Sequence, residues 1–101
     1  MFSANYTMFR EVQPELWPPP LLGHRVVYHS KVSGVPLPAI ITCTQASYDP
    51  EAGSRGDLAP PTSIMHLHLK VLSPGPGSPY DEYDIPPGYG KGQWAPLEGA
   101  L

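Results

Sequence analysis

Cysteine and basic residues are scarce in this sequence. Cys43 is the single cysteine among 101 residues, which excludes a disulfide within the chain and a metal site built from several thiolates. Lysine and arginine number six, are scattered along the chain, and leave a formal net charge of −3 at pH 7. Because binding several phosphates needs a cluster of basic side chains, we expect no nucleic-acid partner and no attachment to an anionic membrane surface.

Long apolar runs are also absent. No stretch approaches the roughly 20 residues needed to cross a bilayer, and the first residues lack the basic start and apolar run of a secretion signal. No phosphate-binding loop, dinucleotide fingerprint or serine-centred elbow occurs. We therefore expect no membrane partner, no cofactor and no enzymatic activity.

Proline and glycine, by contrast, are abundant, with 15 and 10 residues. This content approaches the level typical of disorder, but 41% of the residues are hydrophobic and gather in short runs, which favours a folded domain. The sequence divides into an extended proline-rich arm at residues 1–23, a domain at 24–97 and a tail at 98–101. Residues 46–63 are polar and are predicted to form a mobile loop within the domain.

Short strands are the only regular elements that the pattern predicts. Residues 25–30, 39–45, 65–72, 80–85 and 93–96 are rich in β-branched, aromatic or alternating apolar residues and are separated by turn residues. Segments with a helical period are absent from the sequence. We therefore expect an all-β fold, a small SH3-like barrel or roll of four to five short strands.

Residues 65–72 alternate most regularly. Leu67, Leu69 and Val71 fall on one face of the predicted strand and are expected to point inward. His66 and His68 fall on the other face, which faces solvent or a partner. Two histidines at this spacing can bind a ligand or one metal ion if a third ligand is supplied by a neighbouring strand. The alternative is that both are ordinary surface histidines. The third ligand would be one of His24, His29, Asp81 and Glu82.

The pattern as a whole is similar to a group of small uncharacterised proteins encoded in phage, prophage and actinobacterial genomes, which look like SH3-like β-barrels. The resemblance covers roughly residues 25–96 and excludes the N-terminal arm and the loop after Gln45. It implies a fold and a phage-related origin but no activity. The residues that carry it are Val26, Tyr28, Ser30, Gly34, residues 38–42, residues 66–71, Gly92, Trp94 and Pro96.

Two other groups of reactive side chains have simpler interpretations. Cys43 alternates with Ala39 and Ile41, so it is expected to face the core as a small apolar residue rather than to act as a nucleophile. Asp81, Glu82 and Asp84 lack the regular spacing of a calcium-binding loop and are typical of a solvated edge strand.

Aromatic and proline residues are the candidates for partner binding. Tyrosine and tryptophan carry much of the binding energy of protein interfaces, and proline limits the entropy lost when a segment becomes ordered. The alternative for Trp17 is that it folds back, with Leu21 and Leu22, to cap its own domain. The predicted partner-binding residues are Phe9, Leu16, Trp17, Pro18, Pro19, Pro20, Tyr80 and Tyr83.

The sequence thus predicts a non-enzymatic binding protein. The preferred hypothesis is a phage-type structural or accessory virion protein that binds a protein partner, or another copy in a homo-oligomer, by exchanging an arm that carries Phe9 and Trp17. The alternative is a small host-interaction or anti-defence protein that sequesters a small ligand or a host protein. Its pocket would contain His66 and His68. The expected location is a virion or the host cytoplasm.

Overall fold

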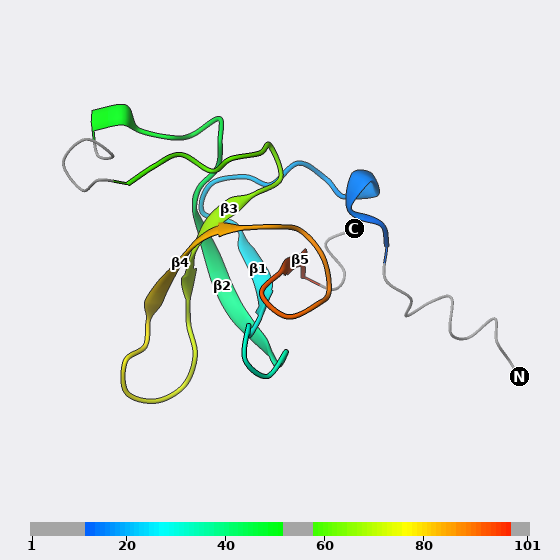
Figure 1. Cartoon of the computed structure of the whole chain (residues 1–101), viewed down its shortest axis with the longest axis vertical. Coiled ribbons are helices and arrows are strands. Elements are labelled where there is room, and N and C mark those ends of the chain that lie inside the picture. The colour runs from blue at the N-terminus through cyan, green and yellow to red at the C-terminus, as the bar shows by residue number, and fades with distance from the viewer. Residues whose placement is uncertain (1–11, 52–57, 98–101) are drawn as a thin grey trace, which may run out of the picture.

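The computed structural model describes residues 12–51 and 58–97, and in this part of the chain the predicted all-β class is confirmed. Five strands form one open antiparallel sheet in the order β4-β3-β2-β1-β5 (Figure 1). A short 3₁₀ turn, η1 (Pro14–Leu16), precedes the sheet. The strands are β1 (Arg25–His29), β2 (Pro36–Cys43), β3 (Leu67–Val71), β4 (Tyr80–Ile85) and β5 (Trp94–Pro96).

Strand β2 begins earlier than the sequence predicts, because it includes two prolines. Pro36 and Pro38 pair with residues of β1, although proline cannot donate a ladder hydrogen bond. The carbonyl of Pro38 accepts the N–H of Leu72, just beyond the end of β3. The nitrogen and the carbonyl of a strand residue point to the same side, so the nitrogen of Pro38 faces β3 and not β1. The N–H that Pro38 lacks therefore removes no hydrogen bond between β2 and β1.

The core lies on one face of the sheet. Leu67, Leu69 and Val71 are fully buried, which confirms the inward face predicted for residues 65–72. Val26 and Tyr28 of β1 lie on the same face. The remaining members of the core cluster are Trp17, Ala39, Ile41, Ile85, Trp94 and Ala95.

The connection after β4 crosses to the opposite edge of the sheet. The N–H of Trp94 donates to the carbonyl of Pro86 at 3.0 Å, and the N–H of Gly88 donates to the carbonyl of Trp94 at 2.9 Å. An isolated parallel bridge joins Pro87 to Trp94. These bonds hold the Trp94 indole over the core, where its Nε1 donates to the carbonyl of Met65 at 2.8 Å.

The segment predicted as a mobile loop makes defined contacts in its described parts. The hydroxyl of Tyr48 donates to the carbonyl of Leu58 at 2.7 Å, and Gln45 Nε2 donates to the carbonyl of Pro61 at 3.5 Å. Pro61 is itself fully buried. The centre of the predicted loop, residues 52–57, lies outside the described residues.

Candidate protein-binding surface

Trp17 occupies the core of its own chain. Its ring centroid lies 5.0 Å from that of Trp94 and 5.6 Å from that of Tyr89, the latter edge to face. Its Nε1 donates to the carbonyl of Val12 at 2.7 Å, and the N–H of Val12 donates to the Tyr89 hydroxyl at 3.1 Å. Of the two placements that the sequence leaves open, Trp17 has the self-capping one, whereas Leu21 and Leu22 do not join it and are more than half exposed. The described part of the predicted arm therefore packs on the domain.

The burial of Trp17 fixes the path of the three prolines that follow it. Trp17 has φ −75° and ψ 150°, which are polyproline values, and the N–H of Gly23 donates to the carbonyl of Ile41 at 2.8 Å. Between these two anchors Pro18 and Pro19 are exposed and Pro20 is half-buried. We call residues 18–20 the proline ridge.

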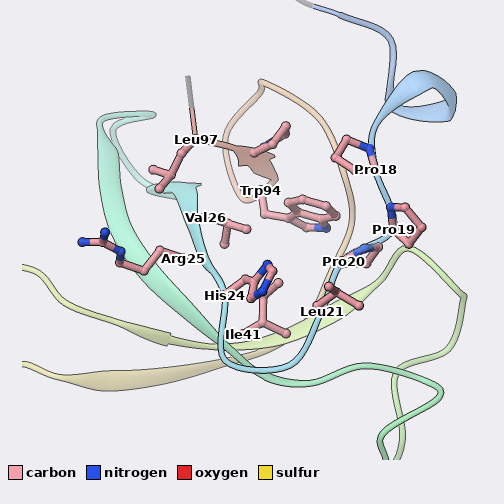
Figure 2. A pocket seen from close by; sticks show the side chains of 11 residues that line it. Pro18, Pro19, Pro20, Leu21, His24, Arg25, Val26, Ile41, Trp94 and Leu97 are labelled. Carbon is pink, nitrogen blue, oxygen red and sulfur yellow. The ribbon is translucent and has the colours of Figure 1, made fainter. Parts of the chain in front are cut away.

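Two apolar grooves adjoin the proline ridge, because Pro19 and Pro20 line both. The first, the Trp94 groove, has a volume of about 300 Å³ and is bordered by Leu21, Arg25 and Trp94 (Figure 2). The second, about 430 Å³, we call the Met65 groove.

The Met65 groove is bordered by Glu15, Ile64 and Met65. Exposed apolar side chains lie in the grooves and next to them in the chain. Ile64, in the Met65 groove, is 73% exposed, and Leu21, in the Trp94 groove, is more than half exposed. Leu16 and Leu22, which neighbour lining residues in sequence, are 72% and more than half exposed. Several exposed apolar side chains near one groove mark an interaction site more often than an isolated exposed leucine does. The surface around the proline ridge is therefore the candidate protein-binding surface.

The other predicted partner-binding residues do not join this surface. Tyr83 is exposed on β4, where its ring packs edge to face on His68, and Tyr80 is half-buried against the core. Both lie on β4, and neither lines the Trp94 groove or the Met65 groove. Phe9 lies outside the described residues.

Sequence reasoning missed Ile64, Met65 and Arg25 as members of the surface. Ile64 and Met65 are more than 40 residues from the prolines in sequence. No periodicity in the chain connects them to residues 18–20. Only the register of the sheet and the packing of Trp17 under Trp94 bring them together.

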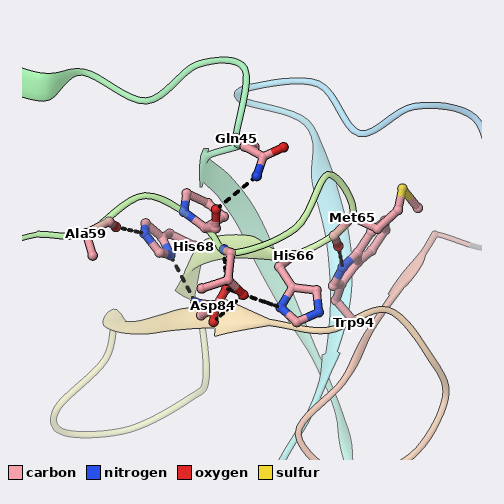
Figure 3. A network of polar contacts seen from close by, with 9 residues as sticks. Gln45, Ala59, Met65, His66, His68, Asp84 and Trp94 are labelled. Atoms are coloured by element: carbon pink, nitrogen blue, oxygen red, sulfur yellow. Dashed lines mark hydrogen bonds and ion pairs between the residues drawn. The ribbon is translucent and has the colours of Figure 1, made fainter.

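The histidine pair does not form an open ligand site (Figure 3). His68 is 3% exposed, so the predicted solvated position is wrong for this residue. Its Nδ1 accepts the backbone N–H of Asp84 at 3.0 Å, and its Nε2 therefore carries the proton and donates to the carbonyl of Ala59 at 2.8 Å. The chain before Pro61 covers this part of β3, which alternation within the strand cannot reveal.

His66 takes part in a more exposed network around the carboxylate of Asp84. Its Nδ1 lies 3.1 Å from Asp84 Oδ1, and the backbone N–H and hydroxyl of Thr62 donate to the same carboxylate. The N–H of Thr62, with the hydroxyl of Thr62 and His66, holds the pKa of Asp84 below its ordinary value. Among the residues that the structure describes, no group of three or more His, Cys, Asp or Glu is arranged to hold a metal ion.

Cys43 has the surroundings of a structural cysteine. It is buried on the same strand as Ala39 and Ile41, as predicted, and its Sγ lies 3.4 Å from the carbonyl of Thr44. Burial raises the pKa of the thiol, although a hydrogen bond with Ser47 acts in the opposite direction. A raised pKa disfavours the thiolate that a nucleophile requires.

The acidic residues of β4 are on an edge strand, as predicted, and each has a cationic neighbour. Lys70 Nζ lies 2.9 Å from Asp81 Oδ1, and Lys31 Nζ lies 3.4 Å from Glu82 Oε1. These residues therefore stabilise the edge of the sheet and are not an open cation site.

Comparison with known proteins adds no relative: no protein-family model, curated protein or solved structure matches the chain. In the part of the chain that the structure describes, no helix is long and apolar enough to cross a membrane.

Proposed function

We propose that this protein is a non-enzymatic binding protein that docks on another protein chain through the proline ridge and the two grooves beside it. The observation that carries the proposal is the position of residues 18–20. Pro18 and Pro19 are exposed, Pro20 is half-buried, and the ridge adjoins two apolar grooves, while Trp17 beside it is buried in the core. Such a segment loses little entropy on binding because its conformation is set beforehand.

The resemblance to phage-encoded proteins supports a virion as the setting, with a structural or accessory role. It also supports a description of the sheet as a variant of the SH3-like barrel. The bridge between Pro87 and Trp94 is consistent with that description, because it ties the chain after β4 to the strand at the other edge. Docking by a fixed surface takes the place of arm exchange, because the Trp17 side chain is engaged in its own core.

A photo-crosslinking amino acid tests this function. One variant carries it in place of Leu16, beside the proline ridge, and a matched variant carries it in place of Val32, which is 81% exposed in the turn between β1 and β2. Both are expressed in cells that make the natural assembly and are irradiated. We expect one discrete crosslinked product from position 16 and none from position 32, and mass spectrometry then identifies the second chain.

Equal labelling at the two positions, or no product at position 16, contradicts the proposal. A folding control is simple, because both positions are exposed and the variants should retain the thermal midpoint of the unmodified protein.

A further inference from the structure

Residues 58–62, which we call the strap, are tied to the sheet by hydrogen bonds with other segments (Figure 3). His68 Nε2 donates to the carbonyl of Ala59 at 2.8 Å, and the N–H of Thr62 donates to Asp84 Oδ1 at 2.8 Å. Two further contacts come from the segment after β2. The strap itself contains no ionisable side chain, so the groups that hold it decide how it responds to pH.

The neighbours of His68 fit only the neutral ring. A backbone N–H can only donate and a carbonyl can only accept, so both ring nitrogens have fixed roles. A second proton, on Nδ1, would face the N–H of Asp84 at 3.0 Å, and that hydrogen bond would be lost. The ring is also shielded from the water that would stabilise its charged form. The neutral ring therefore favours the closed strap, and the charged ring favours an open one.

The carboxylate of Asp84 does not offset this effect, because its contacts are with Thr62 and His66. The N–H of Thr62, above all, keeps its pKa below the ordinary value, so Asp84 stays ionised in mild acid. Burial raises the pKa of the Cys43 thiol, which stays neutral there. The ionisable groups on the strands around His68 are Asp84 and Tyr83 of β4, its register partner Cys43 of β2, and His66 and Lys70 of β3, the last paired with Asp81.

His66 responds to acid in the opposite sense. Its Nδ1 lies 3.1 Å from Asp84 Oδ1, and because a carboxylate oxygen accepts, Nδ1 donates. A proton added at Nε2 leaves this contact in place and strengthens it by charge. Two histidines that are two residues apart on the chain thus have opposite effects on the same part of β4, and His66 provides the control for His68.

We propose that His68 is an acid-sensitive latch, which joins the strap to β4 while its ring is neutral and releases it when Nδ1 takes a proton. Release would expose the ring of Pro61 and the imidazolium, both buried in the closed form. Asp84 has φ 55°, an uncommon conformation that its backbone can leave once the bond to His68 is lost. The latch does not depend on the proposed function, since none of these residues borders either groove.

Hydrogen exchange measured by NMR on the full chain tests the latch. Histidine ordinarily changes its charge between about pH 5 and 8, and exchange is compared across that range after correction for the chemical exchange rate. The N–H groups of Asp84 and Thr62 should lose protection by about tenfold or more as the pH falls. The N–H of Trp94, bonded to the carbonyl of Pro86, should keep its protection, because the opening is local.

Two asparagine variants separate the histidines. In His68→Asn the side-chain oxygen takes the place of Nδ1 and accepts the N–H of Asp84 at every pH, so the pH response should disappear. In His66→Asn, the matched control, the response should remain. A further measurement needs no variant: the nitrogen chemical shifts of the wild-type His68 ring should report a proton on Nε2 alone at neutral pH. They should report a gain of the Nδ1 proton over the pH range in which Asp84 loses protection.

Constant protection of Asp84 and Thr62 across the range would overturn the latch. An equal loss of protection at Trp94 would also overturn it, because the acid would then unfold the whole domain. A pH response that survives in His68→Asn, or that disappears in His66→Asn, would assign the effect to another group. If His68→Asn does not fold, the ring shifts of the wild-type protein decide, and a His68 ring that stays neutral while the strap opens contradicts the proposal.

Discussion

His68 Nδ1 accepts the backbone N–H of Asp84 at 3.0 Å, at the point where β4 bulges away from regular pairing. Leu67 pairs with Ile85 and Leu69 pairs with Glu82, so two residues of β4 oppose His68 alone. Asp84 has φ 55°, a left-handed conformation that is uncommon for a residue other than glycine. The imidazole thus provides the acceptor that this part of β4 cannot find in the β3 backbone.

Substitution of His68 by phenylalanine should therefore destabilise the fold. The enclosed N–H of Asp84 loses its acceptor, at a cost of about 1–3 kcal/mol. His66→Phe should cost at most about 1 kcal/mol, because the contact of His66 with Asp84 is partly solvated. Urea denaturation of the two variants measures the difference in the free energy of unfolding. Equal losses would show that the hydrogen bond of His68 contributes no more than the contact of His66.

Asp84 should make the protein less stable in acid. Its pKa is lowered in the folded state, chiefly by the N–H of Thr62, so the ionised carboxylate stabilises the fold above the ordinary aspartate pKa of about 3.9. That contribution disappears as the pH falls through the lowered folded-state value. In the Asp84→Asn variant the free energy of unfolding should fall less steeply as the pH is lowered through this range. Denaturant titrations between about pH 2 and 6 test this, and parallel curves for the two proteins would argue against it.

Tyr28 should make the protein less stable in alkali. Its buried hydroxyl lies near the Glu82 carboxylate but makes no hydrogen bond of regular geometry with a described residue, and burial, followed by the charge of Glu82 and the contact with its side chain, raises its pKa to about 12. In the unfolded chain Tyr28 ionises near pH 10. The contribution of the folded tyrosine to stability is therefore complete below that pH and is lost as the pH rises toward 12. For a pKa shift of this size, the free energy of unfolding falls by about 3 kcal/mol.

Tyr28→Phe removes both the titration and the buried polar atom. The variant should be at least as stable as the wild-type protein at pH 7, because the hydroxyl that is lost is buried without a hydrogen bond of regular geometry. Its stability should not decline with the wild-type slope between pH 10 and 12. Thermal or urea unfolding at pH 7, 10 and 11.5 decides, and a marked loss at neutral pH would reveal a partner for the hydroxyl.

Trp17 and its neighbour Leu16 should differ sharply when each is truncated. Trp17→Ala removes a buried ring from the contact with Trp94 and should cost about 3–5 kcal/mol. Leu16→Ala alters an exposed side chain and should change the free energy of unfolding by less than about 0.5 kcal/mol. If the Trp17→Ala variant is unfolded, Trp17→Phe gives a measurable intermediate. Similar effects at the two positions would mean that Trp17 is not part of the core.

Local pattern was enough to predict the strands. Residues 80–85 match β4 residue for residue, and alternation placed Leu67, Leu69 and Val71 correctly, because both signals depend on near neighbours in sequence. The enclosure of His68 could not be predicted, since its partner Ala59 lies in a segment without periodicity.

The candidate surface was predicted only in part, for a related reason. Residues 18–20 and Leu16 were expected to bind a partner, and the structure leaves them exposed apart from the half-buried Pro20. The same rule selected Trp17, but composition cannot tell an aromatic anchor for a partner from one for the chain itself. That choice depends on the space under Trp94 and Tyr89, which forms only when the sheet is assembled.

The two edge strands of the sheet bear on whether another copy could add a strand. β5 is three residues long and ends in Pro96, which has no N–H to offer a further strand, and β4 is bent by its bulge at Asp84. Neither edge is a good template for the backbone of another copy. Growth by strand addition, the route to fibres, is therefore disfavoured at both edges of the sheet.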